Sequence, residues 1–435
     1  MKVFFKTFGC RVNQYETEDV REKLMSDGVS TAVKDWSSAD LCVLNTCTVT
    51  KEADRDALAL ARQISRRNPA ARLVVTGCLA TRDPQAVREA APEALIVSNE
   101  EKSGIPSLIG CRAVPDEAGL RSFSEHSRAF LKIQDGCNMY CTYCIIPSVR
   151  PDLSSRRPEA IEAEVSGLVF NGYREIVLCG IRLGRYMAED SFGRRVDFVR
   201  LLSRLMRLPG DFRIRLSSLE ITDVTERFLS LYDESAGKLC PSFHLPIQSG
   251  CDKTLSRMKR WYSTEFYSRR MSALRKRLPE AGVFTDVMVG FPGETADDFE
   301  TSKAFIRKMG FAGLHVFRYS ARSQTPAYDW APVPDAELLR RAKEMRSLDW
   351  DLRTAFASRS VGALRRVLIE ERGDRTEGLT EHFLRVKLDA SPGAGLHAVR
   401  IIASEGPQAH GEIYEKVLSE SLRSAKNTEH TTIGA

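Results

Sequence analysis

Residues 137–144 read Cys137-Asn-Met-Tyr-Cys141-Thr-Tyr-Cys144 and place three cysteines within eight positions, directly after an apolar run at residues 129–134. Three thiolates on one short loop can converge on one metal centre. The spacing differs from the CxxC pair of a zinc knuckle, and no fourth Cys or His lies nearby to close a tetrahedral zinc site. Three thiolates suit a 4Fe-4S cluster that keeps one iron open, with zinc as the alternative.

The chain around this motif alternates strands and helices. Apolar runs predict strands at residues 129–134, 175–179, 213–217, 242–246, 283–289 and 314–319. Amphipathic patterns predict helices at residues 158–171, 197–208, 224–232, 253–258, 264–278 and 296–309. This alternation predicts a full or partial βα barrel over residues 120–359, which ends on a long helix at residues 336–356.

The segments before and after the predicted βα barrel have different sequence patterns. Runs at residues 3–8, 41–45, 73–77 and 94–98, with helical patterns at residues 16–25 and 52–67, predict a parallel α/β domain over residues 1–119. Residues 100–127 lose periodicity and carry several Gly and Pro, so we expect a linker there. Strand-like segments at residues 364–371, 376–380, 383–388, 395–404 and 411–417 predict a small all-β barrel over residues 360–420, followed by a polar tail at residues 421–435.

Composition limits the class of protein. The chain has 435 residues, of which 43% are apolar and 28% charged, which is typical of a globular protein with several domains. Its 11 cysteines are an odd number in a long chain, which argues against a disulfide scaffold. The opening MKVFFKTFGC lacks the apolar stretch of a signal peptide, and no run of about 18 apolar residues predicts a membrane helix. We therefore expect a soluble, cytoplasmic protein with reduced thiols.

Basic residues are concentrated in the predicted barrel. Residues 120–359 contain 38 Lys and Arg against 30 Asp and Glu, whereas residues 360–435 contain 10 against 11. The excess fits solvated helix faces and also fits a surface for a phosphate backbone. Charge alone does not decide between these interpretations.

A second set of cysteines is spread along the N-terminal domain. Cys10, Cys47 and Cys78 each lie at or just past the end of a predicted strand. The carboxyl ends of parallel strands meet at one edge of a sheet, so we expect the three thiols to lie close together. A single cysteine at a strand end is usually a small apolar filler, and Cys42, in the middle of a strand, is predicted to be such a core residue.

The motifs together resemble the radical S-adenosylmethionine (SAM) superfamily. CxxxCxxC with an aromatic residue before the last cysteine is its hallmark, and EIVLCG (175–180), RIRLSSLE (213–220) and DVMVGFPGE (286–294) follow in the order that the superfamily shows. The resemblance implies that one 4Fe-4S cluster binds Cys137, Cys141 and Cys144. It implies SAM contacts at Tyr143, Gly180, Ser218, Gln248, Val289 and Gly290.

The three-part organisation resembles the methylthiotransferases within that superfamily. These combine an α/β domain bearing a second cluster, a radical SAM barrel and a C-terminal TRAM β-barrel. TFGCRVNQYE and LNTCTVT, with Arg11-Val12-Asn13-Gln14, resemble the branch that acts on threonylcarbamoyladenosine in tRNA. Branches acting on isopentenyladenosine and on a ribosomal protein typically show GCQMN and GCPKN instead, and both remain alternatives.

The resemblance implies a mechanism with two 4Fe-4S clusters and two molecules of SAM per turnover. Cys10, Cys47 and Cys78 would hold the second cluster, which carries the sulfur to be inserted at adenine carbon 2 of position 37, beside the anticodon. The implied partners are the tRNA anticodon loop, an electron-donor protein such as flavodoxin or ferredoxin, and a sulfur donor, with no membrane. Candidate RNA contacts in the TRAM-like barrel are Arg365, Arg366, Arg385, Lys387 and Arg400.

Some residues depart from the family pattern. Pro151 follows Arg150 where glycine is common, and Arg182 stands where asparagine is common, which puts a polar contact near the cofactor in doubt. His244 lies on an apolar strand and is predicted to be a hydrogen-bonded core residue. Trp261 and Tyr262, beside Lys259-Arg260, fit either base stacking or core packing.

Overall fold

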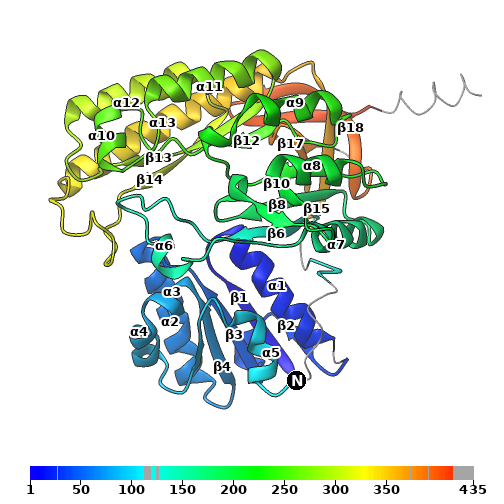
Figure 1. Cartoon of the computed structure of the whole chain (residues 1–435), viewed down its shortest axis with the longest axis vertical. Helices are drawn as coiled ribbons and strands as arrows, with labels where there is room; N and C mark the ends of the chain where they lie inside the picture. The colour runs from blue at the N-terminus through cyan, green and yellow to red at the C-terminus, as the bar shows by residue number, and fades with distance from the viewer. Residues whose placement is uncertain (27, 112–118, 124–126, 373–374, 390, 415–435) are drawn as a thin grey trace, which may run out of the picture.

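The computed structural model describes the chain except for residues 27, 112–118, 124–126, 373–374, 390 and 415–435 (Figure 1). The predicted polar tail and part of the predicted linker lie outside the described residues. The described chain forms a parallel α/β part at one end of the long axis, a larger α/β part at the other end, and a small β-barrel beside the larger part (Figure 1). The predicted fold class is confirmed.

The N-terminal part is built on a five-stranded parallel sheet of order β2-β1-β3-β4-β5. Its strands are β1 (Lys2–Thr7), β2 (Thr31–Val33), β3 (Leu41–Thr46), β4 (Arg72–Gly77) and β5 (Leu95–Val97). Its helices are α1 (Arg11–Met25), η1 (Trp36–Ser38), α2 (Lys51–Arg67), α3 (Cys78–Arg82), α4 (Pro84–Ala90), η2 (Lys102–Gly104) and α5 (Ile105–Leu108). All strands run in one direction, so their carboxyl ends share one edge of the sheet.

Alternating side chains bury both faces of this sheet. Cys42 and Leu44 of β3 pack in one hydrophobic cluster with residues of α2. Val43 belongs to a second cluster, with Val20 of α1 and Ile105 of α5. Successive side chains of a strand point to opposite faces, so a strand covered on both sides reads as a continuous apolar run. The position of Cys42 in the core is confirmed.

The central part is a partial barrel of parallel strands. Strands β6 (Ala129–Asp135), β8 (Glu175–Gly180) and β11 (Arg213–Leu216) form one sheet, and β12 (Ser242–His244), β13 (Gly282–Val289) and β14 (Gly313–Arg318) form another. Single bridges at Ile214–Leu239 and Ser218–His244 join the two sheets. No pairing of β14 with β6 closes the barrel among the described residues.

Helices and short strands surround this arc. The helices are α6 (Ile146–Val149), α7 (Pro158–Phe170), η4 (Leu183–Arg185), α8 (Phe198–Met206), η5 (Ile221–Asp223), α9 (Glu226–Glu234), α10 (Asp252–Arg257), α11 (Thr264–Arg277), α12 (Ala296–Met309) and α13 (Asp335–Arg359). The short strands are β7 (Ser154–Ser155), β9 (Met187–Glu189) and β10 (Arg195–Asp197). In Figure 1, α11, α12 and α13 lie along the end of the molecule that is farthest from the N-terminal sheet.

The C-terminal part is a closed barrel of order β15-β16-β17-β19-β18. Its strands are β15 (Leu364–Arg372), β16 (Arg375–Thr380), β17 (Arg385–Leu388), β18 (Gly395–Glu405) and β19 (Gln408–Ile413). It docks at the amino-terminal end of the central strands, because Arg213 donates to the carbonyl of Leu379 at 2.8 Å and Arg215 to that of Thr380 at 2.9 Å. The carboxyl ends of the central strands therefore face the N-terminal part.

Two details differ from the sequence-based prediction. Helix α1 begins at Arg11, five residues earlier than predicted, because Cys10 takes the N-cap position without a capping side chain that would signal a start. The predicted linker contains η2 and α5, and Ile105 is fully buried beneath the sheet. A four-residue helix is too short to show a period, which explains the wrong prediction there.

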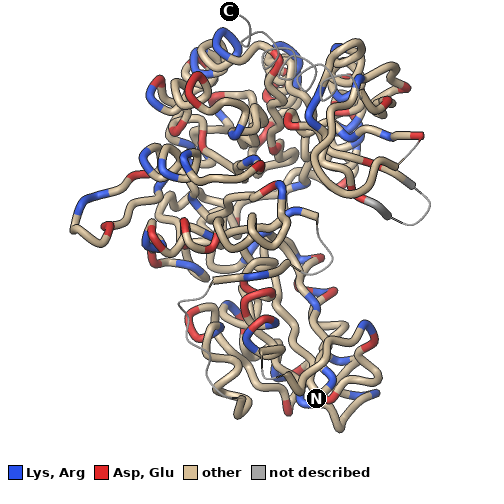
Figure 2. The backbone as a smooth tube through the Cα atoms, turned by 90° about the vertical axis from the view of Figure 1, so that its right-hand side faces the viewer, with Lys and Arg blue, Asp and Glu red and all other residues tan. Residues whose placement is uncertain are grey.

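Charged side chains of both signs are interspersed over the described chain (Figure 2). Several arginines of the central part are held by acids: Arg204 donates to Glu162 at 2.5 Å, and Arg277 to Glu226 at 2.6 Å. These pairs favour the interpretation of solvated helix faces for those arginines. None of the helices in the described residues is long and apolar enough to cross a membrane.

Candidate active site

Cys10, Cys47 and Cys78 lie together at the carboxyl edge of the N-terminal sheet. Cys10 precedes α1, Cys47 follows β3 directly, and Cys78 opens α3 directly after β4. All three line a single cavity. The structure thus brings together the three thiols that the sequence placed at equivalent strand ends.

Glycines precede Cys10 and Cys78 at positions where a side chain does not fit. Gly9 has a φ of +94°, and a Cβ there would lie 2.6 Å from Cβ of Cys47. Gly77 has a φ of +97°, and a Cβ there would lie 2.3 Å from the carbonyl oxygen of Thr46. Glycine adopts such backbone angles freely and leaves this space open. The two Gly-Cys pairs therefore let neighbouring strand ends approach closely enough for their thiols to face one cavity.

The loop that carries Cys137, Cys141 and Cys144 runs from β6 to α6 and is fixed on both sides. The amide of Cys137 donates to the carbonyl of Arg150 at 3.3 Å, and the amide of Thr142 donates to the carbonyl of Met258 at 3.2 Å. The guanidinium of Arg260 donates to Sγ of Cys141 at 3.4 Å. A cation at this distance suits a thiolate or a negatively charged cluster.

Burial raises the pKa of several of these thiols. Cys10 is exposed and lines the cavity, and desolvation by the surrounding protein raises its pKa. Burial raises the pKa of Cys47 to about 11, and burial together with the neighbouring Cys141 raises that of Cys144 to about 12. Thiolates form at such sites when a metal displaces the protons. The thiols are suited to metal ligation rather than to free nucleophilic attack.

The spacing of the thiols distinguishes between a cluster and a single ion. Among the described residues, neither set of three thiols has all its sulfur atoms within 4.8 Å of one another. Two sulfurs on one zinc ion cannot be farther apart than twice the Zn–S distance of about 2.3 Å. A 4Fe-4S cluster is larger and accepts wider spacing, so both sets fit a cluster better than they fit zinc.

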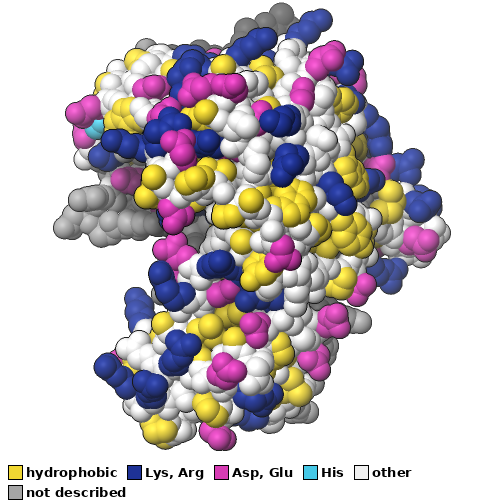
Figure 3. Space-filling view, turned by 90° about the vertical axis from the view of Figure 1, so that its left-hand side faces the viewer, with side chains coloured by type: hydrophobic (Ala, Val, Ile, Leu, Met, Phe, Trp, Pro, Cys, Tyr) yellow, Lys and Arg dark blue, Asp and Glu magenta, His cyan; other side chains and the backbone are white. Residues whose placement is uncertain are grey.

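One cavity of ≈ 590 Å³ connects the N-terminal thiols with the barrel. Its wall on the barrel side comes from β8, β11, β12, β13 and β14, and Phe383 of the C-terminal barrel also lines it. The side view shows a notch where the N-terminal part meets the rest of the molecule (Figure 3). The volume is in the range of pockets that hold a small molecule or a single nucleotide base.

Two of the predicted SAM contacts line this cavity, and the others lie outside its lining. Gly180 and Ser218 line the cavity, at the carboxyl ends of β8 and β11. Val289 and Gly290 end β13 on the same side of the barrel, and the amide of Met288 donates to the carbonyl of Gln248 at 2.9 Å beside them. Tyr143 packs edge-on against Phe291, with ring centroids 6.3 Å apart, which orients the loop of the three cysteines.

His244 is hydrogen-bonded as predicted, but it lines the cavity and does not belong to the core, so that part of the prediction is wrong. It is half-buried and lines the cavity, where Nδ1 lies 2.6 Å from Oγ of Ser218 and Nε2 lies 2.8 Å from Oδ1 of Asp286. His315 adds a third contact, with Nδ1 at 3.2 Å from the same Asp286 oxygen. Burial raises the pKa of Asp286, but the two histidines outweigh it and lower the pKa to about 2.

Sequence reasoning missed Asp286 and His315 as members of the site. Asp286 opens the DVMVGFPGE motif, and His315 lies on an ordinary apolar strand. Their positions on adjacent parallel strands bring them together, with Asp286 paired in register with His315. The three side chains form an anchored polar group that orients Ser218.

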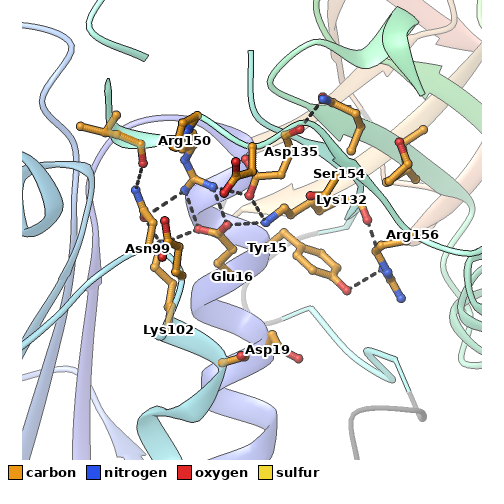
Figure 4. A pocket seen from close by; sticks show the side chains of 18 of the residues that line it. Tyr15, Glu16, Asp19, Asn99, Lys102, Lys132, Asp135, Arg150, Ser154 and Arg156 are labelled. Carbon is orange, nitrogen blue, oxygen red and sulfur yellow. Dashed lines mark hydrogen bonds and ion pairs between the residues drawn. The ribbon is translucent and has the colours of Figure 1, made fainter. Parts of the chain in front are cut away.

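A second cavity contains a buried ion network between the N-terminal and central parts (Figure 4). Glu16 of α1 is its centre and accepts from Lys102 Nζ at 2.5 Å and from both terminal nitrogens of Arg150 at 2.8 Å. Arg150 also reaches Asn13 at 3.0 Å and Asn99 at 3.3 Å. The network connects the loop after Cys144 with the helix after Cys10.

The structure shows where the residues that depart from the family pattern lie. Arg182 is buried beside Asp223, and its Nε and Nη1 have no hydrogen-bond partner in the described structure. Burial raises the pKa of Cys137, and the charge of Arg182 offsets part of this effect. Pro151 lines the second cavity. Trp261 is half exposed, with the Arg182 guanidinium 5.6 Å from its ring.

Several other residues belong to the protein interior. Tyr262 is buried and donates to the carbonyl of Pro246 at 2.9 Å, so core packing describes it. Cys179, Cys240 and Cys251 are buried, and Cys179 also lines the cavity of the thiols. Cys111 packs at the margin of the N-terminal core.

Some of the candidate RNA-binding residues of the C-terminal barrel are already paired with acidic side chains. Arg365 donates to Glu280 at 3.0 Å, and Arg366 donates to Asp211 at 2.7 Å. Arg385 is half exposed and lies 3.8 Å from Glu377 and 3.9 Å from Glu370, and Lys387 is exposed on the same strand. The Arg400 guanidinium lies 4.9 Å from the ring of Tyr414.

Two family models match the chain. The model described as "Uncharacterized protein family UPF0004" matches residues 2–98, and that of the radical SAM superfamily matches residues 131–306. Among solved structures, the radical SAM methyltransferase TsrM from Kitasatospora setae has a TM-score of 0.55 at 15% identity, over 75% of each chain. At this identity the likeness concerns the fold alone, and the fold is that of a radical SAM enzyme.

Relatives match nearly the full length. The chain is 37% identical over 399 residues to the threonylcarbamoyladenosine tRNA methylthiotransferase MtaB of Chlamydia pneumoniae, covering 91% of this chain and 93% of the relative. It is 34% identical to MtaB of Bacillus subtilis, with coverage of 97% and 99%. It is 30% identical to the tRNA-2-methylthio-N(6)-dimethylallyladenosine synthase of Herminiimonas arsenicoxydans, with coverage of 95% and 99%. The chain belongs to the family of radical SAM tRNA methylthiotransferases.

Proposed function

We propose that this enzyme inserts a methylthio group at carbon 2 of the adenine in N6-threonylcarbamoyladenosine, at position 37 of tRNA. The observation that carries the proposal is the single cavity that Cys10, Cys47 and Cys78 share with the carboxyl ends of the barrel strands. Barrel enzymes react at that end of their strands. Sulfur held by the N-terminal thiols and a base attacked from the barrel side therefore meet in one space.

Two 4Fe-4S clusters fit the two sets of thiols, with one set for SAM and the other for the sulfur. When bound, these groups supply the one-electron chemistry that an aromatic C–H bond of low acidity requires. The chain's own residues hold and orient the reactants. Ser218, held by His244, offers a hydroxyl to the ribose of SAM, and the Gly180 strand end leaves room for its methionine part.

The cavity has groups suited to a splayed RNA base. Phe317 and Val49 line it and are 44% and 52% exposed, so each has apolar surface free for contact. Bases in single-stranded loops stack on aromatic side chains such as Phe317, and Val49 adds apolar contact. We assign the phosphate contacts of the C-terminal barrel to Arg385 and Lys387 first, because acids already hold Arg365 and Arg366.

The test is nucleoside analysis after reaction with purified tRNA. The anaerobically reconstituted protein, with SAM, a reductant and a sulfide source, should convert threonylcarbamoyladenosine into its methylthio derivative, measured by mass spectrometry. Conversion of isopentenyladenosine tRNA in preference would move the enzyme to the alternative branch. No product from either tRNA under conditions that cleave SAM would disprove both.

A set of cysteine variants tests the division of labour. Changing Cys10, Cys47 and Cys78 to alanine should lower the iron content from about eight to about four, spare SAM cleavage and abolish the methylthio product. A double variant of Cys42 and Cys111 is the matched control, because these thiols lie in the same domain but do not line the cavity. Product formation by the triple variant would contradict the proposal.

A further inference from the structure

Arg11 is a cation in the active-site cavity that no acid neutralises. It follows Cys10 directly, opens α1 and lines the cavity that the three thiols share. Its guanidinium lies 5.9 Å from the centre of the Phe130 ring on β6. The guanidinium of Arg11 forms no hydrogen bond and no ion pair with any of the described residues. Burial and the nearby Arg128 lower the pKa of Arg11, whereas Cys179 and Glu175 act in the opposite direction without contacting the guanidinium.

The other charged groups that line this cavity are compensated. Arg150 is bound by Glu16, and Arg215 donates to Glu175 at 2.8 Å and 2.9 Å. Asp286 is matched by its two histidines. No further carboxylate of the described residues lines the cavity. A cluster on the three thiols would bring negative charge to the same cavity, but it offers no pair of oxygen acceptors to the guanidinium beside Phe130. The fork of Arg11 is therefore left to pair with an anion from outside the chain.

The shape of the guanidinium narrows the class of anion. Its planar fork pairs with a carboxylate or a phosphate through two parallel hydrogen bonds. Cys179 and Arg215 of the barrel line the same cavity as Arg11, and the Arg11 guanidinium lies near Phe130 of β6, so it faces the barrel. An enzyme that acts on a base takes the base out of its stack into the active site, while the phosphates remain part of the RNA backbone. A carboxylate carried on the base is therefore the anion that enters the cavity with it.

We propose that Arg11 binds the carboxylate of the threonylcarbamoyl substituent and thereby selects this adenosine over those with an uncharged substituent. The inference rests on the proposed function and adds the residue that sets its specificity. The carboxylate of SAM has the same chemistry and is the competing source. Unpaired donors of Arg182 beside Cys137 supply a separate place for that group, which leaves Arg11 to the substrate.

The test compares two RNA substrates that differ only in this charge. One is an anticodon stem-loop with threonylcarbamoyladenosine at position 37, and the other carries the carboxamide in place of the carboxylate. The wild-type holoenzyme should bind the acid about 10- to 100-fold more tightly, with the same ratio in KM and little change in kcat. Binding is measured by fluorescence anisotropy without SAM and turnover by mass spectrometry.

Variants of Arg11 test whether this residue causes the preference for the carboxylate. Arg11→Gln should lose the preference for the acid and bind the carboxamide as the wild type does, while Arg11→Lys should retain a smaller preference. Iron content and SAM binding should be unchanged in both variants. Equal binding of acid and carboxamide by the wild type overturns the inference even if the variants fail to fold.

Two further outcomes distinguish a wrong assignment of Arg11 from a wrong proposed function. Weaker SAM binding by Arg11→Gln, with the acid preference intact, would give the residue to the SAM carboxylate and overturn the assignment. Absence of methylthio product from the acid RNA with the wild-type enzyme would instead count against the proposed function, whatever Arg11 binds.

Discussion

Replacing Glu16 by glutamine removes the single charge on which the contact between the N-terminal and central parts converges. The carboxylate accepts from Lys102 at 2.5 Å, from Lys132 at 2.6 Å and from Arg150 at 2.8 Å. Lys102 and Arg150 are almost fully buried, at 3% and 4% exposure. A neutral amide leaves Arg150 and Lys132 with one remaining carboxylate, that of Asp135, and leaves Lys102 with the neutral acceptor of Asn99.

The expected loss of stability follows from the burial of Lys102 and Arg150. Removing one member of a buried ion pair typically costs about 3–5 kcal/mol, because the remaining charges stay desolvated without compensation. We expect Glu16→Gln to lower the free energy of unfolding by this amount. Urea unfolding followed by circular dichroism measures it. Glu52→Gln is the matched control, since its pair with Arg55 is 72% and 70% exposed and should contribute less than about 1 kcal/mol.

The pH dependence gives an independent check on the same residue. Burial alone raises the pKa of Glu16, but Lys102, Lys132 and Arg150 lower it well below its usual 4.5. A folded-state pKa below the unfolded one stabilises the protein above pH 4.5, and this stabilisation disappears as the pH falls further. The difference between wild type and Glu16→Gln should therefore be constant near neutral pH and shrink in acid. A loss no larger than that of Glu52→Gln, or one that grows in acid, would refute the reasoning.

Three further substitutions test the site. Gly9→Ala should displace Cys47 and lower the iron content by about four per chain, as measured by iron and sulfide analysis. Gly28→Ala is the control, because Gly28 also has a positive φ but has open space around it, and this variant should keep its full iron content. Asp286→Asn should weaken SAM binding about 10-fold, measured by equilibrium dialysis, because both histidines lose the negative charge of their common acceptor. Arg322→Met breaks a buried contact between the central part and α2, and should lower the free energy of unfolding by about 3–5 kcal/mol in urea melts.

The sequence was sufficient to predict the strands and the thiols, because both are local signals. Cys10, Cys47 and Cys78 could be placed together since parallel strands align their ends, and this needs only the strand boundaries. The polar group at His244 could not be predicted, since its neighbours come from two other strands and meet only through pairing. The ion pair of Glu16 and Arg150 joins residues 134 positions apart, and no pattern in either segment points to the other.

Arg150 shows how the fold sets the distance between the two groups of thiols. Its carbonyl accepts the amide of Cys137, while its side chain holds Asn99, whose Nδ2 donates to Sγ of Cys78 at 3.7 Å. A single buried residue therefore touches the supports of both sets. Reactants that must meet on one base require fixed positions, and a shift of about 1 Å can cost 100-fold in rate. The network that joins the two parts is accordingly a positioning device for the chemistry as well as a source of stability.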